Sequence, residues 1–127
     1  MADVTSAFEA KSLSVYDLFS KPGQFFYIPS YQRKYSWGRE RITSLLSDIL
    51  QGFNRLLDDK EAYTFLGSII TVSNIGDESI FPIVKEHKPS QVVSIIDGQQ
   101  RTTTLLVINV ALHNLLVEKY FLFSKND

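Results

Sequence analysis

The chain has 127 residues, enough for one small domain with a hydrophobic core. Hydrophobic residues make up 44% and charged residues 21% of it, a balance typical of a soluble globular protein and not of a disordered one. The formal net charge of −1 excludes a strongly basic nucleic-acid-binding module, so any basic patch must be local. Because there is no cysteine, disulfides, cysteine-ligated zinc and thiol nucleophiles are excluded. The N-terminus is not a signal peptide, and we expect a cytoplasmic protein.

The first half of the chain predicts two helices around one strand. Residues 1–12 are expected to be a flexible lead-in to a single domain over residues 13–127. Ser14 is positioned to cap a short helix that ends at a Pro-Gly pair. A short buried strand is predicted over residues 25–28, and the apolar spacing of residues 38–53 predicts an amphipathic helix.

The second half predicts three strands and a long helix. Residues 65–72 indicate a strand with an internal glycine, which marks a bulge or a close backbone approach. Residues 80–85 and 92–96 indicate two further strands joined by a polar hairpin. A final helix is predicted from about residue 102 to 120, with too many polar residues to cross a bilayer. The sequence therefore predicts an α+β fold, a small mixed sheet flanked by helices.

The most informative motif is Asp-Gly-Gln-Gln-Arg-Thr-Thr-Thr at residues 97–104, where a predicted strand turns into a predicted helix. Free N–H groups at a helix N-terminus favour anions, especially phosphate. Gly98 lets the backbone come close or take a positive φ, and Arg101 offers a planar fork for phosphate oxygens. Asp97 could hold a divalent metal or polarise a water. The motif predicts a turn that binds phosphate.

The same turn also has a purely structural interpretation, because Asp-Gly followed by threonines is an ordinary way to end a strand and cap a helix. Gln99, Gln100 and Arg101 shift the balance towards a site, since capping needs none of them. The motif is neither a Walker A loop nor a dinucleotide fingerprint.

A second polar cluster, Tyr-Gln-Arg-Lys-Tyr-Ser-Trp at residues 31–37, mixes aromatic and basic side chains. This mixture suits nucleotides or nucleic acid, because aromatic faces stack on bases and cations meet phosphates. The alternative is a surface loop that packs under the next helix, and Trp37 in particular is expected to have mainly a packing role. The candidate DNA-binding residues are Arg33, Lys34, Arg39 and Arg41, with a solvated helix start as the alternative.

With these two segments, the chain resembles the N-terminal domain of GmrSD-type restriction proteins, in the ParB/sulfiredoxin-like group. The matching blocks occur in the family's order and cover most of residues 12–112. They are SVYDLF at 14–19, YIPSYQRKYSW at 27–37, LLSDI at 45–49, FLGSI at 65–69 and IDGQQRTTT at 96–104. Asp-Gly-Gln-Gln-Arg is the family's signature.

The resemblance implies a nucleoside triphosphate-binding domain that couples nucleotide use to DNA sensing, with a separate HNH-type nuclease domain or subunit. It implies Mg²⁺ as the cofactor, bound through Asp97, and a catalytic role for Asp97, Gln100 and Arg101. The implied nucleotide-binding residues are Tyr31, Gln32, Arg33, Gly67, Ser68, Gly98, Gln99, Arg101 and Thr102.

Two alternatives remain open beside this reading. One is a non-enzymatic DNA-sensing or nuclease-associated module, and the other an interaction scaffold. Whether this chain hydrolyses nucleotides by itself is also open. The apolar run at residues 120–123 has nothing left to bury it, which predicts a longer protein or an interface, with a homo-oligomer as one form of it.

Overall fold

A three-stranded mixed sheet forms the centre of the computed structural model, which describes residues 8–73 and 91–124. Strand β3 (Gln91–Asp97) is the middle strand of the order β1-β3-β2. It pairs in parallel with β1 (Gln24–Tyr27) and antiparallel with β2 (Ile70–Ser73). The described residues also form three helices, α1 (Val15–Ser20), α2 (Arg39–Asp58) and α3 (Gln99–Ser124). The α+β class predicted from the sequence is confirmed.

The core lies where the central strand meets the first turns of α3. Val92, Val93 and Ile95 on β3 are buried, together with Leu105 on α3 and Leu45 on α2. Burial of these β-branched and leucine side chains provides the hydrophobic stabilisation of the core. The sequence pattern placed a strand here correctly, from residue 92 to 96, and the structure extends it by one residue at each end.

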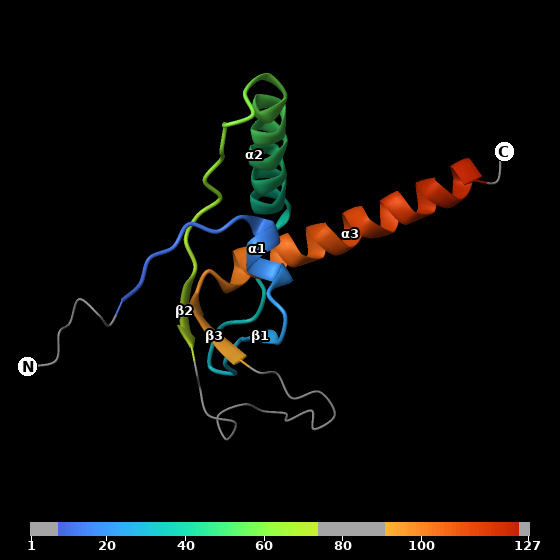
Figure 1. Cartoon of the computed structure of the whole chain (residues 1–127). Coiled ribbons are helices and arrows are strands. Elements are labelled where there is room, and N and C mark those ends of the chain that lie inside the picture. The colour runs from blue at the N-terminus through green and yellow to red at the C-terminus, as the bar shows by residue number, and fades with distance from the viewer. Residues whose placement is uncertain (1–7, 74–90, 125–127) are drawn as a thin grey trace, which may run out of the picture.

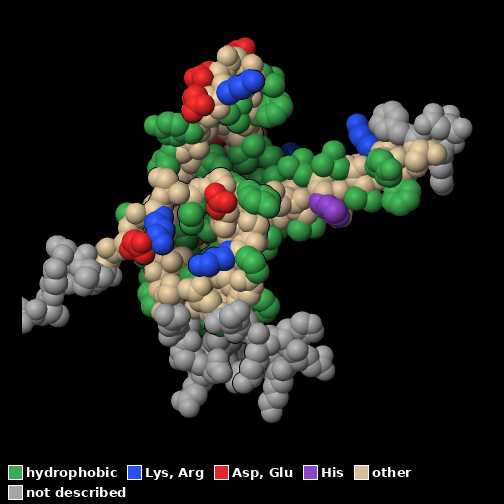
Figure 2. Space-filling view, viewed as in Figure 1, with side chains coloured by type: hydrophobic (Ala, Val, Ile, Leu, Met, Phe, Trp, Pro, Cys, Tyr) green, Lys and Arg blue, Asp and Glu red, His purple; other side chains and the backbone are tan. Residues whose placement is uncertain are grey.

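The two long helices diverge from this core, as Figure 1 shows. α2 rises away from the sheet, whereas α3 continues past α1 and carries the C-terminus far from the other elements. Apolar side chains cover much of α3 on the face seen in Figure 2. Both helices are longer than the predicted residues 38–53 and 102–120.

The short helix α1 begins as predicted at Ser14, whose side-chain oxygen accepts a hydrogen bond from the Asp17 backbone N–H at 3.0 Å. Such a cap satisfies one of the donors that a helix start leaves unpaired. Residues 8–12, in the predicted lead-in, contain no helix or strand and are exposed. Residues 1–7 lie outside the described residues.

The predicted strand over residues 65–72 is wrong in its first half. Strand β2 begins only at Ile70, because Gly67 has a φ of 116°, outside the range that a strand adopts. The glycine does mark a close backbone approach, described below. The strand predicted at residues 80–85 and the hairpin after it lie outside the described residues.

By length and composition alone, the part of α3 from Gln99 to Leu122 could cross a membrane. A single helix of this kind is weak evidence of a membrane protein. Its first turn contains the buried polar side chains of Gln99 and Gln100, which pack against the rest of the domain.

Candidate functional site

The turn between β3 and α3 forms the N-terminus of a long helix. Gly98 adopts a φ of 89°, and a Cβ there would lie 3.0 Å from the Ser68 carbonyl oxygen, so glycine is required. The first helical hydrogen bond runs from the Thr102 N–H to the Gly98 carbonyl, at 2.9 Å. The N–H groups of residues 99–101 precede that bond, so the helix itself offers them no acceptor.

The loop between β1 and α2, residues 28–38, is fastened to this turn by the two glutamines of the motif. Gln99 donates from Nε2 to the Arg33 carbonyl at 2.7 Å. Gln100 donates from Nε2 to the Lys34 carbonyl at 3.2 Å, and its Oε1 accepts from the Ser36 N–H at 2.7 Å. Both glutamine side chains are buried. Their amides therefore fix the backbone of this loop against the turn between β3 and α3.

Two further bonds extend this attachment along the loop. Gln32 donates from Nε2 to the Ile96 carbonyl at the end of β3, at 3.2 Å. The Tyr35 hydroxyl lies 2.9 Å from Thr104 Oγ1, which in turn donates to the Gln100 carbonyl at 2.7 Å. Because a threonine hydroxyl has one proton, Tyr35 must be the donor of the first of these bonds. The loop and the turn thus form one unit.

Arg101 connects the turn to the segment before β2. Its Nη1 donates to the Ser68 carbonyl at 3.2 Å. A Cβ on Gly67 would collide with the guanidinium carbon of Arg101, so the bare backbone of Gly67 lies directly against this side chain. Gly67 and Ser68 therefore form the surface that the Arg101 guanidinium contacts. Arg101 is half-buried, so part of its side chain is open to solvent.

The structure brings the predicted nucleotide-binding residues together from three segments of the chain: the loop, the turn and the stretch before β2. Tyr31, at 77% exposed, faces solvent, while the buried Thr102 bonds back to Gly98 through its Oγ1 at 2.9 Å. The structure shows that these three segments lie close together, and the roles of their residues in nucleotide binding stay predictions.

The structural role of Gln99 and Gln100 was missed by the sequence reasoning, which assigned them to a phosphate cradle and to catalysis. The signal was available, because amide side chains crowded into a first helical turn need partners for both their N–H₂ and carbonyl groups. One such group is left over: Gln99 Oε1 is buried and has no hydrogen-bond partner among the described residues. A buried acceptor of this kind requires a donor from water or a ligand.

Asp97 fits a magnesium ion only in part. Its side chain is exposed at the end of β3. Within residues 8–73 and 91–124, no group of three or more His, Cys, Asp or Glu residues could hold a metal. Mg²⁺ is commonly bound by one or two carboxylates together with substrate phosphates. Asp97 therefore suits a metal that arrives with a triphosphate.

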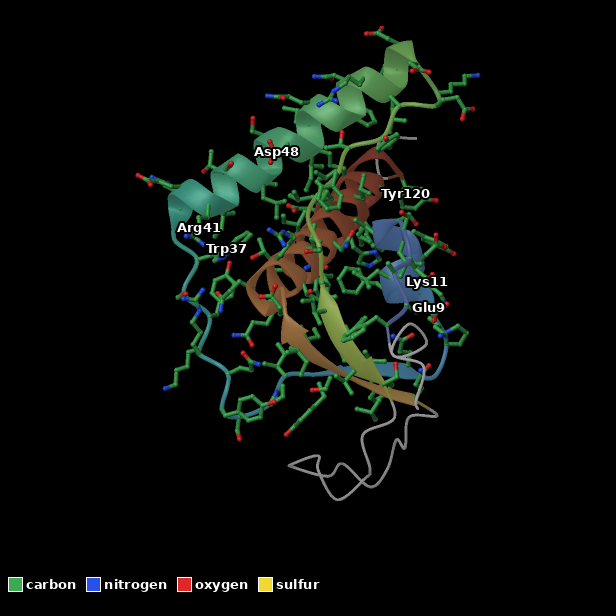
Figure 3. The ribbon with its side chains drawn as sticks, turned by 90° about the vertical axis from the view of Figure 1, so that its left-hand side faces the viewer. Glu9, Lys11, Trp37, Arg41, Asp48 and Tyr120 are labelled. Carbon is green, nitrogen blue, oxygen red and sulfur yellow. The ribbon has the colours of Figure 1, made fainter. Side chains whose placement is uncertain are left out.

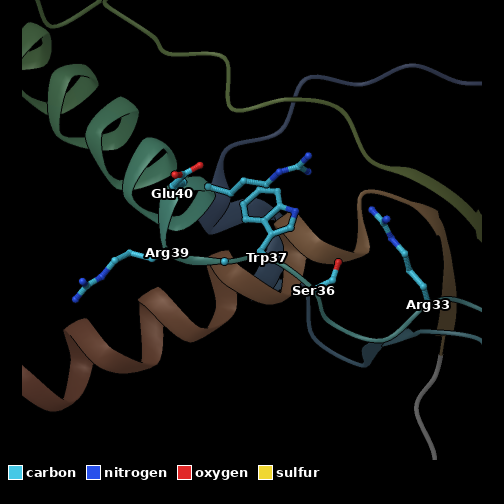
Figure 4. Close-up of a pocket in the computed structure, with 7 residues that line it drawn as sticks. Arg33, Ser36, Trp37, Arg39 and Glu40 are labelled. Atoms are coloured by element: carbon cyan, nitrogen blue, oxygen red, sulfur yellow. The ribbon is translucent and has the colours of Figure 1, made fainter.

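Three of the four predicted DNA-binding residues share a cavity of about 360 Å³ at the start of α2 (Figure 4). Arg33 comes from the loop, and Arg39 and Arg41 from the first turn of the helix. Figure 3 shows Trp37 and Arg41 together at this end of α2. Lys34 is exposed but does not line the cavity. The cavity is completed by Ser36, Trp37, Gly38 and Glu40.

The fold and the turn together define a class of protein: a small α+β domain whose central strand delivers a glycine turn and an arginine to the N-terminus of a long helix. The family model for the N-terminal domain of the GmrSD restriction endonuclease matches residues 15–126. The chain belongs to this family, and so is a domain of a restriction-system protein, as the sequence resemblance indicated. The family context associates such a domain with a nuclease partner domain. No curated protein matched the chain.

Proposed function

We propose that the chain binds a nucleoside triphosphate at the turn between β3 and α3 and, in the complete restriction protein, hydrolyses it. The observation that carries this proposal is the N-terminus of α3, a helix of 26 residues, with Gly98 in a left-handed conformation and the partly exposed Arg101 beside it. A helix N-terminus with close backbone and a guanidinium is suited to phosphate oxygens.

The roles follow from the positions of the groups. The N–H groups of residues 99–101 and the Arg101 fork would bind the phosphates, while Tyr31 and Arg33 would meet the base or the phosphates from the loop. Gln99 Oε1, a buried acceptor without a partner among the described residues, would accept a hydrogen bond from a hydroxyl or amino group of the nucleotide or from a bound water. In this arrangement the protein contributes binding and positioning, as phosphoryl transfer requires.

Magnesium would enter with the triphosphate and be bound by Asp97 and the phosphate oxygens. The ion would supply neutralisation of the charge that develops on the transferred phosphoryl group. We propose catalytic roles for Asp97 and Gln100, and the contacts of Gln100 also give it a second role, that of fixing the loop.

Hydrolysis would be coupled to DNA sensing and to the activity of a fused HNH-type nuclease in a cytoplasmic defence system. The alternative, a non-enzymatic DNA-sensing module, is favoured by the cavity with three arginines at the start of α2. That module would bind DNA with or without a triphosphate, and its affinity would fall steeply with salt.

Thermal denaturation with each of the four ribonucleoside triphosphates and Mg²⁺ tests the proposal. A ligand at about a hundred times its dissociation constant adds roughly 2.7 kcal/mol to stability, an effect easily seen in a melting curve. We expect one or more nucleotides to raise the melting temperature, and Arg101→Ala to remove the shift.

Arg55→Ala is the matched control, because Arg55 lies near the C-terminus of α2, away from the turn between β3 and α3. It should keep the full shift. If no nucleotide shifts the wild-type transition, or if Arg101→Ala shifts as much as the wild type, nucleotide binding at this turn is wrong.

A further inference from the structure

The cavity at the start of α2 is lined by three arginines, Arg33, Arg39 and Arg41. The salt bridge found in the described residues joins Lys11 and Glu9, at 3.1 Å. None of the guanidiniums of Arg33, Arg39 and Arg41 therefore has an ion-pair partner within residues 8–73 and 91–124. Like charges gathered around one cavity repel one another, which destabilises the free domain and favours an anionic ligand.

The first turn of α2 increases this positive potential. Gly38 is the N-cap residue and provides no side-chain hydrogen bond to the helix. The partial positive charge of a 20-residue helix is thus exposed at the cavity wall, next to Arg39 and Arg41. Glu40 is the one acidic residue in the lining, and it leaves the cavity with a net positive charge.

An aromatic ring lies among these cations. Trp37 is half-buried and lines the cavity, so part of the indole remains accessible. In Figure 4 the side chains of Arg33 and Arg39 extend on opposite sides of this ring. If a base of a nucleic-acid strand stacks on the indole, the phosphates on either side of that base can therefore each meet a guanidinium. Stacking on aromatic rings combined with a cationic groove is how single strands are bound without sequence preference.

We propose that this cavity binds locally single-stranded DNA, with one unpaired base stacked on Trp37 and the flanking phosphates on Arg33, Arg39 and Arg41. The inference deepens the DNA-sensing part of the proposed function and is independent of whether the β3–α3 turn binds a triphosphate. It replaces the mainly structural role that the sequence suggested for Trp37 with a contact role.

The loop also joins this cavity to the phosphate turn. Arg33 lines the cavity with its side chain, while its carbonyl accepts the Gln99 amide. Ser36 lines the cavity too, and its N–H donates to Gln100 Oε1. A DNA strand that displaces the loop on binding must therefore also displace or strain the hydrogen bonds between the loop and the turn.

Trp37 is the chain's single tryptophan, which makes its fluorescence a direct probe of the cavity. Titration of the full chain with a ten-nucleotide oligothymidylate should quench this emission, whereas a blunt duplex of similar length should quench it far less. With three phosphate contacts, affinity should fall roughly 20-fold between 50 and 200 mM salt.

Arg39→Ala combined with Arg41→Ala should weaken binding and reduce the salt effect to roughly 3-fold, as expected for one remaining contact. Arg55→Ala, with its cation near the other end of α2, should bind as the wild type does. Circular dichroism of each variant confirms that the fold is kept.

Absence of quenching by the oligonucleotide would overturn the proposal, as would a double variant that binds unchanged. Stronger quenching by the duplex than by the single strand would also overturn it. Arg101→Ala separates the two sites: it should remove the triphosphate effect on melting and leave the oligonucleotide quenching intact. Loss of both in that variant would mean that Trp37 reports the phosphate turn, and a separate DNA site would be wrong.

Discussion

Gly67 is the residue on which the position of Arg101 depends most directly. Its φ of 116° is costly for any residue with a Cβ, and that Cβ would occupy the space of the Arg101 guanidinium. We expect Gly67→Ala to lower the free energy of unfolding by about 2 kcal/mol and to displace the arginine from Ser68. Urea denaturation measures the first effect, and loss of the triphosphate-dependent melting shift measures the second.

Gly38→Ala is a suitable control for this prediction. The Gly38 φ is −88°, and a Cβ there would meet nothing within 4 Å. The cost should be about 0.5 kcal/mol, the difference between glycine and alanine as N-cap residues. Equal destabilisation by the two substitutions would show that the contact between Gly67 and Arg101 has no special importance.

At this scale the sequence predicted backbone geometry better than side-chain partners. The positive φ of Gly98 and the close approach at Gly67 were foreseen, because glycine has few other reasons to occur at such positions. The bonds of Gln99 and Gln100 to residues 33–36 were not. They join residues more than sixty positions apart, and no local pattern carries that information.

The attachment of the loop to the turn determines whether the two elements act together. Gln100→Ala removes both bonds of that side chain to the loop, and we expect the free energy of unfolding to fall by about 2 kcal/mol. The released loop should also become a substrate for trypsin at Arg33 and Lys34. Limited proteolysis followed by mass spectrometry measures this directly.

Gln51→Ala is the matched control, because Gln51 is an exposed residue within α2. It should change neither stability nor the cleavage pattern, since surface substitutions of this kind usually have small effects. If Gln100→Ala is as resistant to trypsin as this control, the glutamine does not fix the loop.

A second prediction at the element scale concerns communication through the same loop. If the turn and the Trp37 cavity are both occupied sites, a triphosphate should change the oligonucleotide affinity, and the oligonucleotide should change the triphosphate affinity by the same factor. We expect a factor of about 5 or more, measured by Trp37 quenching with and without nucleotide. In Gln100→Ala the factor should approach one. An equal factor in wild type and variant would show that the two sites do not communicate through the bonds of Gln100 to the loop.

Element positions were predictable where periodicity was clear, as for α2 and β3, and less so at their ends. The predicted start of the last helix at residue 102 ignored the glutamines, whose burial and tertiary bonds favour a helix that starts at Gln99. A strand was predicted from residue 65 because the β-branched and aromatic residues there favour one locally. The prediction failed because the conformation of Gly67 interrupts the strand.

At the scale of the whole molecule, the outer part of α3 is the feature that a single copy of the described domain does not explain. The apolar side chains of this helix are not confined to one face, and Leu116, Tyr120 and Leu122 are 69%, 72% and 61% exposed. A helix of this composition is normally buried on several faces. Beyond Leu105 and the half-buried Ile108, the apolar side chains of α3 cover nothing in the described structure.

Self-association of the chain through α3 is therefore expected in dilute buffer. Exposed apolar patches of this kind drive association because burial removes them from water, at roughly 25 cal/mol per Å². Size-exclusion chromatography with light scattering should show a mass above 14.5 kDa that rises with concentration. Leu116→Lys should shift the distribution towards the monomer, since a charge on the buried face opposes association. Leu13→Lys, at a leucine that is 59% exposed but outside α3, should behave as the wild type does. A monomeric mass at every concentration would contradict the prediction and would indicate that the exposed face of α3 is tolerated in water.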